Sequence, residues 1–205
     1  MRPAAEMLVL ESRALPVIVA RHTPEALSKP TVLPGWRVRD VIAHCGAALR
    51  RLVDGEVLEF TPQANQIDVD ERRSWPMEHV VKELVEVYPA AAAAIDAAGG
   101  AFDGLGLGEW IHGGDLREPL GEPNPYGGPG VDLALPLLVS RSVAREAPGV
   151  RVDLDDRRFI FGVGDPVGDL RTDAATFVRL CAGRAPSADR YELSGVPEQA
   201  LLLFS

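Results

Sequence analysis

Residues 38–53 of this 205-residue chain read VRDVIAHCGAALRRLV, and this stretch decides the fold more than any other. Its apolar side chains recur every three or four positions, as one buried face of an α-helix requires. The stripe consists of Val38, Val41, Ile42, Cys45, Leu49 and Leu52. We therefore expect a long amphipathic helix that packs against other helices and ends at Gly55.

Segments on both sides of this helix also carry apolar residues at helical spacing. We expect further helices over residues 4–22, with a kink or an interruption at Pro16, over 74–98 and over 131–145. Residues 56–74 are polar and without a period, which predicts a long loop. Glycines crowd residues 99–114 and make this stretch poor helix material, although a weak helical pattern continues to Leu120.

The pattern of apolar and polar residues changes after Pro148. Residues 150–154 alternate between apolar and polar side chains, as a strand does, and residues 158–163 and 191–193 predict further strands. Helices are expected over 174–181 and 197–203. The sequence therefore predicts an α+β fold, with a helical domain over residues 1–147 and a small α/β domain over residues 148–205.

Composition excludes several classes of protein. Hydrophobic residues make up 46% and charged residues 25%, which is typical of a globular chain. Asp and Glu outnumber Lys and Arg by 30 to 21, and this acidity argues against a dedicated binder of nucleic acid or of an anionic membrane. Two cysteines cannot form a disulfide-rich scaffold. The early apolar run, residues 14–20, is too short to span a membrane and follows Glu6 and Glu11, so we expect a cytoplasmic protein.

Three side chains have the right chemistry for a metal ion. Glu109 and His112 are three residues apart, which puts a carboxylate and an imidazole on one helical face, as in metal-binding helical bundles. His44 would complete a set of two imidazoles and one carboxylate that leaves a coordination position open. His44 also lies on the flank of the apolar stripe, so a half-exposed surface histidine is the alternative interpretation.

Other polar residues near these three have two interpretations each. Asp40, one turn before His44, and Asp115, one turn after His112, could orient the imidazoles, or could form ordinary surface pairs. Arg37 and Arg117 could hold a substrate carboxylate, or could be solvated surface charges. The two thiols, Cys45 and Cys181, fall in apolar stretches and are expected to be buried core residues.

Two segments resemble the signatures of a known family. Residues 33–44, LPGWRVRDVIAH, resemble the PGW-x-V-x-D-V-x-x-H motif of the mycothiol-dependent maleylpyruvate isomerase family within the DinB-like superfamily. Residues 111–121, IHGGDLREPLG, resemble its second motif, and residues 171–195 resemble its small sterol-carrier-like C-terminal domain. The resemblance implies a DinB-like four-helix bundle that holds one divalent metal, expected to be zinc, through His44 and the Glu/His pair. It also implies mycothiol, the small thiol of actinobacteria, as cosubstrate.

The implied function is that of a metal-dependent isomerase or thiol transferase that uses mycothiol on a small electrophile. In the family the acid usually stands four residues before the histidine, where this chain has Gly108, and Glu109 is only three before it. A non-catalytic protein that binds a small ligand or partner through an eroded metal site is therefore one alternative. A hydrolase that uses metal-bound water is another. The choice of electrophile is expected to reside partly in residues 56–74, which carry no readable motif.

Overall fold

The computed structural model describes residues 1–56, 61–186 and 190–204. It divides the chain into two compact units, Met1–Pro125 and Tyr126–Ser205. The predicted α+β class, with a helical N-terminal part and a small α/β C-terminal part, is confirmed. The units divide earlier than the expected position after residue 147, so the helix over 131–144 groups with the sheet. Among the described residues, no helix combines the length and apolarity needed to cross a membrane.

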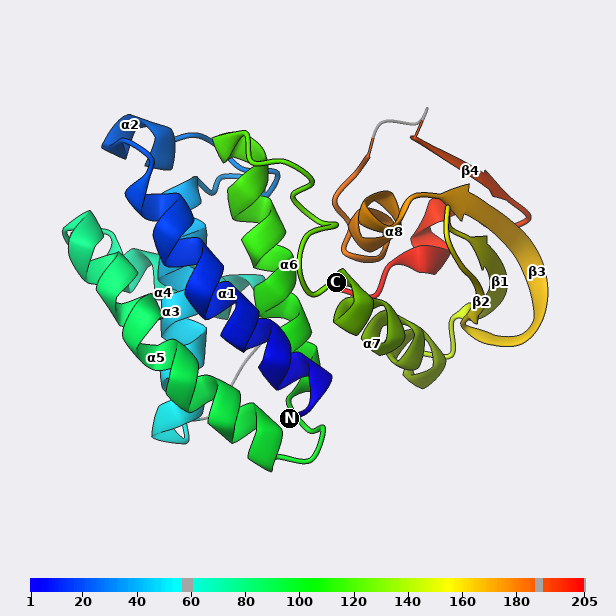
Figure 1. Ribbon diagram of the computed structural model, residues 1–205, viewed down its shortest axis with the longest axis horizontal. Coiled ribbons are helices and arrows are strands. Elements are labelled where there is room, and N and C mark those ends of the chain that lie inside the picture. Colours follow the sequence, from blue (N-terminus) through cyan, green and yellow to red (C-terminus); the bar gives the residue numbers. More distant parts are fainter. Residues whose placement is uncertain (57–60, 187–189, 205) are drawn as a thin grey trace. The chain divides into compact units, whose positions relative to one another are not determined.

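The N-terminal unit is a helical bundle (Figure 1). Its long helices are α1 (Pro3–Ala20), α3 (Val38–Asp54), α5 (Met77–Ala97) and α6 (Asp103–Leu120). Helix α3 packs against α5 and α6, and α1 packs against the same two, so these four of the described helices form a closed ring. The short helix α2 (Pro24–Leu27) precedes α3, and α4 (Pro62–Arg72) packs against α3.

The apolar stripe of α3 supplies the centre of the bundle core. All six residues of the predicted stripe are buried, as are large side chains such as Leu8, Tyr88 and Ile95 from α1 and α5. Burying one such side chain contributes about 1.5–3 kcal/mol relative to leaving it exposed. Gly55 ends α3 in the left-handed conformation, as expected from the sequence.

The prediction of a loop over residues 56–74 was wrong, because most of this segment forms helix α4. Thr61 accepts a hydrogen bond from the backbone of Ala64 at 3.1 Å and Pro62 takes the first helical position, a normal helix start. Only Asp68, Val69 and Arg72 of this helix are buried, so no apolar period marks it in the sequence. Residues 57–60 of the expected loop lie outside the described residues.

Two segments that the sequence marks as unfavourable for a helix lie within continuous helices. Helix α1 runs through Pro16, and α6 runs through the glycine-rich stretch. At Gly106 a Cβ atom would lie 2.8 Å from the carbonyl oxygen of Ala4, so this glycine lets α1 approach the α6 backbone closely. Gly106 thus reflects close packing, and the weak helical pattern of this stretch belongs to a continuous helix.

The C-terminal unit is a four-stranded sheet, within the described residues, with helices packed on it. Its strands are β1 (Pro148–Asp153), β2 (Arg158–Phe161), β3 (Val163–Thr172) and β4 (Tyr191–Ser194), in the order β2-β1-β3-β4. Strand β3 pairs parallel with β1 and antiparallel with β4. The helical elements are α7 (Val131–Ala144), α8 (Ala174–Cys181) and the 3-10 turn η2 (Glu198–Leu201). The sequence missed β3, whose glycines and Pro166 hide its pattern.

Candidate functional site

Two histidines from neighbouring helices meet inside the N-terminal unit. The ring centroids of His44 on α3 and His112 on α6 lie 5.3 Å apart, with the rings edge to face at 85°. His44 is 5% exposed, so the interpretation as a half-exposed surface histidine was wrong. The helical wheel of α3 could not show that Trp36 and α4 cover this flank of the helix.

Each imidazole is bonded through Nδ1 to a carboxylate. His44 Nδ1 lies 3.1 Å from Asp68 Oδ2, and His112 Nδ1 lies 2.9 Å from Asp115 Oδ2. An ionised carboxylate only accepts hydrogen bonds, so Nδ1 carries the proton in each ring. In the neutral form of each imidazole, Nε2 is then the unprotonated nitrogen and is available as a donor atom for a ligand.

The partner of His44 is Asp68, and Asp40 has a different role. The backbone N–H of Arg37 donates to Asp40 Oδ2 at 2.8 Å, so Asp40 caps the N-terminus of α3. Asp68 comes from α4, a helix that the sequence pattern did not predict. The available signal was Thr61-Pro62, the same start pattern as Thr23-Pro24 of α2.

Burial keeps His44 neutral near physiological pH. Removal from water lowers the pKa of His44, and the hydrogen bond to Asp68 opposes this effect only in part. The nearby His112 and Arg51 lower the pKa further, because each carries or can carry positive charge. A neutral imidazole with a protonated Nδ1 is the form that can accept at Nε2.

Glu109 is the buried acid of the site. Burial raises the pKa of Glu109 to about 7, and the neighbouring His112 and a hydrogen bond from the Cys45 thiol oppose this increase. Its Oε2 atom has no hydrogen-bond partner among the described residues. A buried oxygen without a partner is costly, so Oε2 of Glu109 needs an explanation, such as a catalytic role or a bound ion.

Cys45 is a core thiol, as expected, and not a nucleophile. It is buried, and burial together with the negative charge of Glu109 raises its pKa well above that of a free thiol. Its hydrogen bond goes to Glu109, so this thiol supports the acid beside the histidine pair. Cys181, in the other unit, is buried as well.

The two candidate arginines differ in their surroundings. Arg117 forms a two-point ion pair with the buried Glu11 of α1, so its guanidinium is already occupied inside the bundle. Arg37 is exposed immediately before α3. The structure therefore gives Arg117 a structural partner in place of the expected substrate carboxylate, and leaves Arg37 on the surface.

The donor types at the histidine pair fit a divalent cation. Two Nε2 atoms and the unpartnered Glu109 Oε2 are suitable ligands for zinc. Glu109 and Asp115 are both buried, among the described residues. Among the same residues, however, no three His, Cys, Asp or Glu side chains gather into a group that could hold a metal as placed. The structure thus brings the two imidazoles together, and Glu109 is not grouped with them as a third ligand.

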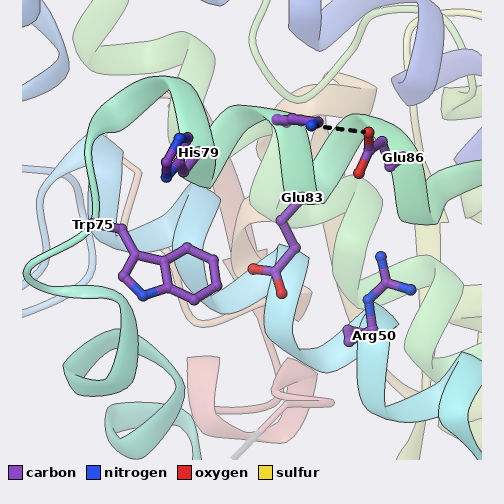
Figure 2. Close-up of a pocket in the computed structure, with 6 residues that line it drawn as sticks. Arg50, Trp75, His79, Glu83 and Glu86 are labelled. Carbon is purple, nitrogen blue, oxygen red and sulfur yellow. Dashed lines mark ion pairs between the residues drawn. The ribbon is translucent and has the colours of Figure 1, made fainter.

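A separate cavity lies elsewhere on the N-terminal unit (Figure 2). It has a volume of about 350 Å³ and is lined by Arg50, Trp75, His79, Lys82, Glu83 and Glu86. Lys82 pairs with Glu86 at 3.7 Å, and Glu83 pairs with Arg72 at 2.8 Å, so most of its charges are already neutralised. None of the residues predicted for the site lines this cavity, and the histidine pair remains the candidate site.

Comparisons with known proteins found a matching family model and similar solved structures. Residues 8–103 match the family model of the mycothiol maleylpyruvate isomerase N-terminal domain, a range that contains His44 and Asp68 and ends before Glu109. No curated protein matches the chain. A crystal structure of the mycothiol-dependent maleylpyruvate isomerase is similar at a TM-score of 0.65 and 15% identity, covering 95% of this chain and 94% of that one. A mutant of that enzyme with a histidine replaced by alanine is similar at a TM-score of 0.62, with the same identity and coverage.

Proposed function

We propose that the protein is a mycothiol-dependent enzyme of the maleylpyruvate isomerase kind, because residues 8–103 match the family model of the mycothiol maleylpyruvate isomerase N-terminal domain. Its substrate class is a small electrophile, and its reaction is an isomerisation or a thiol transfer. The observation that carries the proposal is the buried pair His44 and His112, each bonded to a carboxylate through Nδ1. Two imidazoles held in this way favour a ligand at Nε2 over a purely structural role.

His44, His112 and Glu109 are the residues that would hold a divalent metal, for which zinc is the proposed ion. When bound, such an ion lowers the pKa of a thiol and so supplies thiolate at neutral pH, where a free thiol is only a few per cent ionised. Addition of a thiolate to an activated double bond, rotation and elimination would isomerise a substrate. Addition alone would give a conjugate.

The chain's own residues prepare the site for this chemistry. Asp68 and Asp115 keep the proton of each imidazole on Nδ1, which leaves Nε2 free to bind. The ring of Trp36, 5.2 Å from that of His44, helps exclude water from α3 at this point. A site with little water strengthens the electrostatic interactions of any charged group that enters it.

A non-catalytic binding protein is the second candidate. Two observations favour it: the described residues form no three-donor group, and Gly108 stands where the family usually has its acid. In this case the histidine pair would bind a small ligand or partner, without activating a thiol.

Metal content and thiol-dependent activity test the proposal together. We expect the purified protein to contain or take up about one zinc ion per chain, and the His44→Ala and His112→Ala variants to lose it. With maleylpyruvate and mycothiol, the native protein should show cis–trans isomerisation that depends on the thiol. His79→Ala is the matched control, because His79 is an exposed histidine of α5 that lines the separate cavity.

The outcomes separate the candidates. Zinc binding that both site variants lose and the control keeps, with mycothiol-dependent turnover of an electrophile, supports the enzyme. A protein that takes up no zinc and turns over no electrophile with mycothiol overturns it in favour of the binding protein. Full activity in the His44→Ala variant would also refute the proposed role of the histidine pair.

A further inference from the structure

Helix α4 contains a buried acidic residue, and the pattern of its own sequence does not account for that burial. The helix is polar, and Asp68 is one of only three of its residues that are buried. Burying an isolated carboxylate costs several kcal/mol, so a buried Asp needs partners. Both partners come from α3: Asp68 Oδ2 lies 3.1 Å from His44 Nδ1, and Asp68 Oδ1 lies 2.8 Å from Arg51 Nη2.

The positions of the two partners on α3 explain how one carboxylate reaches both. His44 and Arg51 are seven residues apart, so they lie on the same face of the helix, two turns from each other. Arg51 balances the negative charge of Asp68 through an ion pair at Oδ1, an oxygen that accepts no hydrogen bond from the described residues. The other oxygen is left to accept the Nδ1 proton of His44.

A second contact from α4 holds the ring that covers His44. The indole N–H of Trp36 donates to Gln66 Oε1 at 3.0 Å, and the Trp36 ring lies against His44 at a tilt of 55°. Gln66 and Asp68 thus fix the two rings from one short helix. The position of the His44 ring is determined by α4 as much as by α3.

We propose that Asp68 is a positioning residue of the site, which fixes the tautomer and the ring orientation of His44 so that Nε2 is presented to a ligand. This inference rests on the proposed function only for the identity of that ligand, a divalent cation. Free neutral imidazole exchanges between two tautomers, and a carboxylate at Nδ1 selects one of them. Carboxylates that orient a metal-binding histidine in this way typically change metal affinity by roughly 10- to 100-fold when they are lost.

The first measurement needs no variant. In metal-free protein labelled with ¹⁵N, the ring nitrogens of His44 should show a protonated Nδ1 and an unprotonated Nε2. The opposite tautomer in the native protein overturns the proposal, whatever metal the protein binds. This measurement stays valid even where a substitution at Asp68 prevents folding.

The second measurement uses Asp68→Asn, which keeps the size of the side chain and removes its charge. We expect mixed or reversed His44 tautomers in metal-free protein, and zinc affinity roughly 10- to 100-fold weaker in a competition titration with a chelating dye. Asp68→Glu, which restores a carboxylate, should recover part of the affinity. Asp70→Asn is the matched control, because it removes one charge from an exposed position of the same helix.

The outcomes distinguish this inference from the proposed function. An Asp68→Asn variant that folds, binds zinc as tightly as the native protein and keeps the native His44 signals refutes the positioning role and leaves the function intact. A native protein that binds no zinc but shows the expected tautomer, altered in Asp68→Asn and unchanged in Asp70→Asn, refutes the metal and supports the positioning role. A purely structural role would lower stability without moving the His44 signals.

Discussion

The guanidinium of Arg117 and the carboxylate of Glu11 form a forked ion pair that joins α6 to α1. Nη1 lies 3.0 Å from Oε1, and Nη2 lies 2.7 Å from Oε2. Glu11 is 1% exposed, and burial raises its pKa, while the charge and hydrogen bonds of Arg117 oppose that increase. Arg117 is therefore required where it lies, since its departure toward a substrate would leave a buried carboxylate without a partner.

We expect Arg117→Met to destabilise the protein by about 3–5 kcal/mol, the usual cost of removing one partner from a buried ion pair. Urea unfolding of the native and variant proteins measures this loss. Arg37→Met is the control, because Arg37 is exposed and its loss should change stability by less than about 0.5 kcal/mol. A variant at Arg117 that unfolds at the native urea concentration would show that the pair contributes little.

Two glycines of α6 should respond in opposite ways to alanine. At Gly113 a Cβ atom would lie 2.6 Å from Arg117 Nη1 and 2.9 Å from the Glu11 carboxylate, whereas at Gly108 it would meet nothing within 4 Å. Gly113→Ala must displace a buried ion pair, so we expect a loss of about 1–3 kcal/mol. Gly108→Ala removes a flexible residue from a helix interior and should gain about 0.5–1 kcal/mol. Thermal unfolding of the two variants measures these changes, and equal shifts in Tm would contradict the prediction.

Where the pattern lay within one element, the sequence predicted the structure well. The six-residue stripe of α3 predicted both the helix and its buried face, because a 3.6-residue period depends only on neighbours along the chain. Strands β1 and β2 followed from alternation in the same way. Strand β3 did not, since glycines and Pro166 replace the apolar side chains that would have shown its period.

The site was harder to predict, because its contacts come from several elements. His44 seemed half exposed while only its own helix was considered, and it is buried because Trp36 and Asp68 cover it. Asp40 has the correct spacing to reach His44 one turn away, but the backbone N–H of Arg37 at the start of α3 donates to it instead. Composition and periodicity give no information about which of several polar helices will fold over a given residue.

Glu109 should make the stability of the metal-free protein depend on pH. Its pKa is raised from 4.5 to about 7 by burial, so the folded state binds more protons than the unfolded state between these values. The free energy of unfolding should therefore fall as pH rises from 4.5 to 7, by up to about 3 kcal/mol from this group. Urea unfolding of chelator-treated protein across this range measures the slope.

Glu109→Gln supplies the comparison for that slope, because the amide does not titrate. Its stability should fall less steeply between pH 4.5 and 7 than that of the native protein. The pKa of Glu11 is also raised by burial, but Glu11 is present in both proteins, so the difference isolates Glu109. Parallel curves for the two proteins would show that Glu109 titrates as it does in water.

The position of the acid on α6 can be tested by moving it. Glu109 is three residues before His112, and Gly108 stands at the four-residue spacing, where a Cβ atom has open space. Both spacings place a side chain on the face of His112, since residues three and four apart are neighbours on a helix. If Glu109 is the third ligand, Glu109→Gln should weaken zinc binding, and the double variant Gly108→Glu/Glu109→Gln should recover it.

Competition with a chelating dye measures the zinc affinity of each variant. Gly108→Gln/Glu109→Gln is the control, because it also replaces glycine by a long side chain but supplies no carboxylate. Recovery in the carboxylate variant alone would show that the site accepts an acid from either position, so Gly108 marks a relocated ligand. Unchanged affinity in Glu109→Gln would instead mean that its unpartnered Oε2 does not bind the ion. Loss without recovery would show that the third ligand must come from position 109.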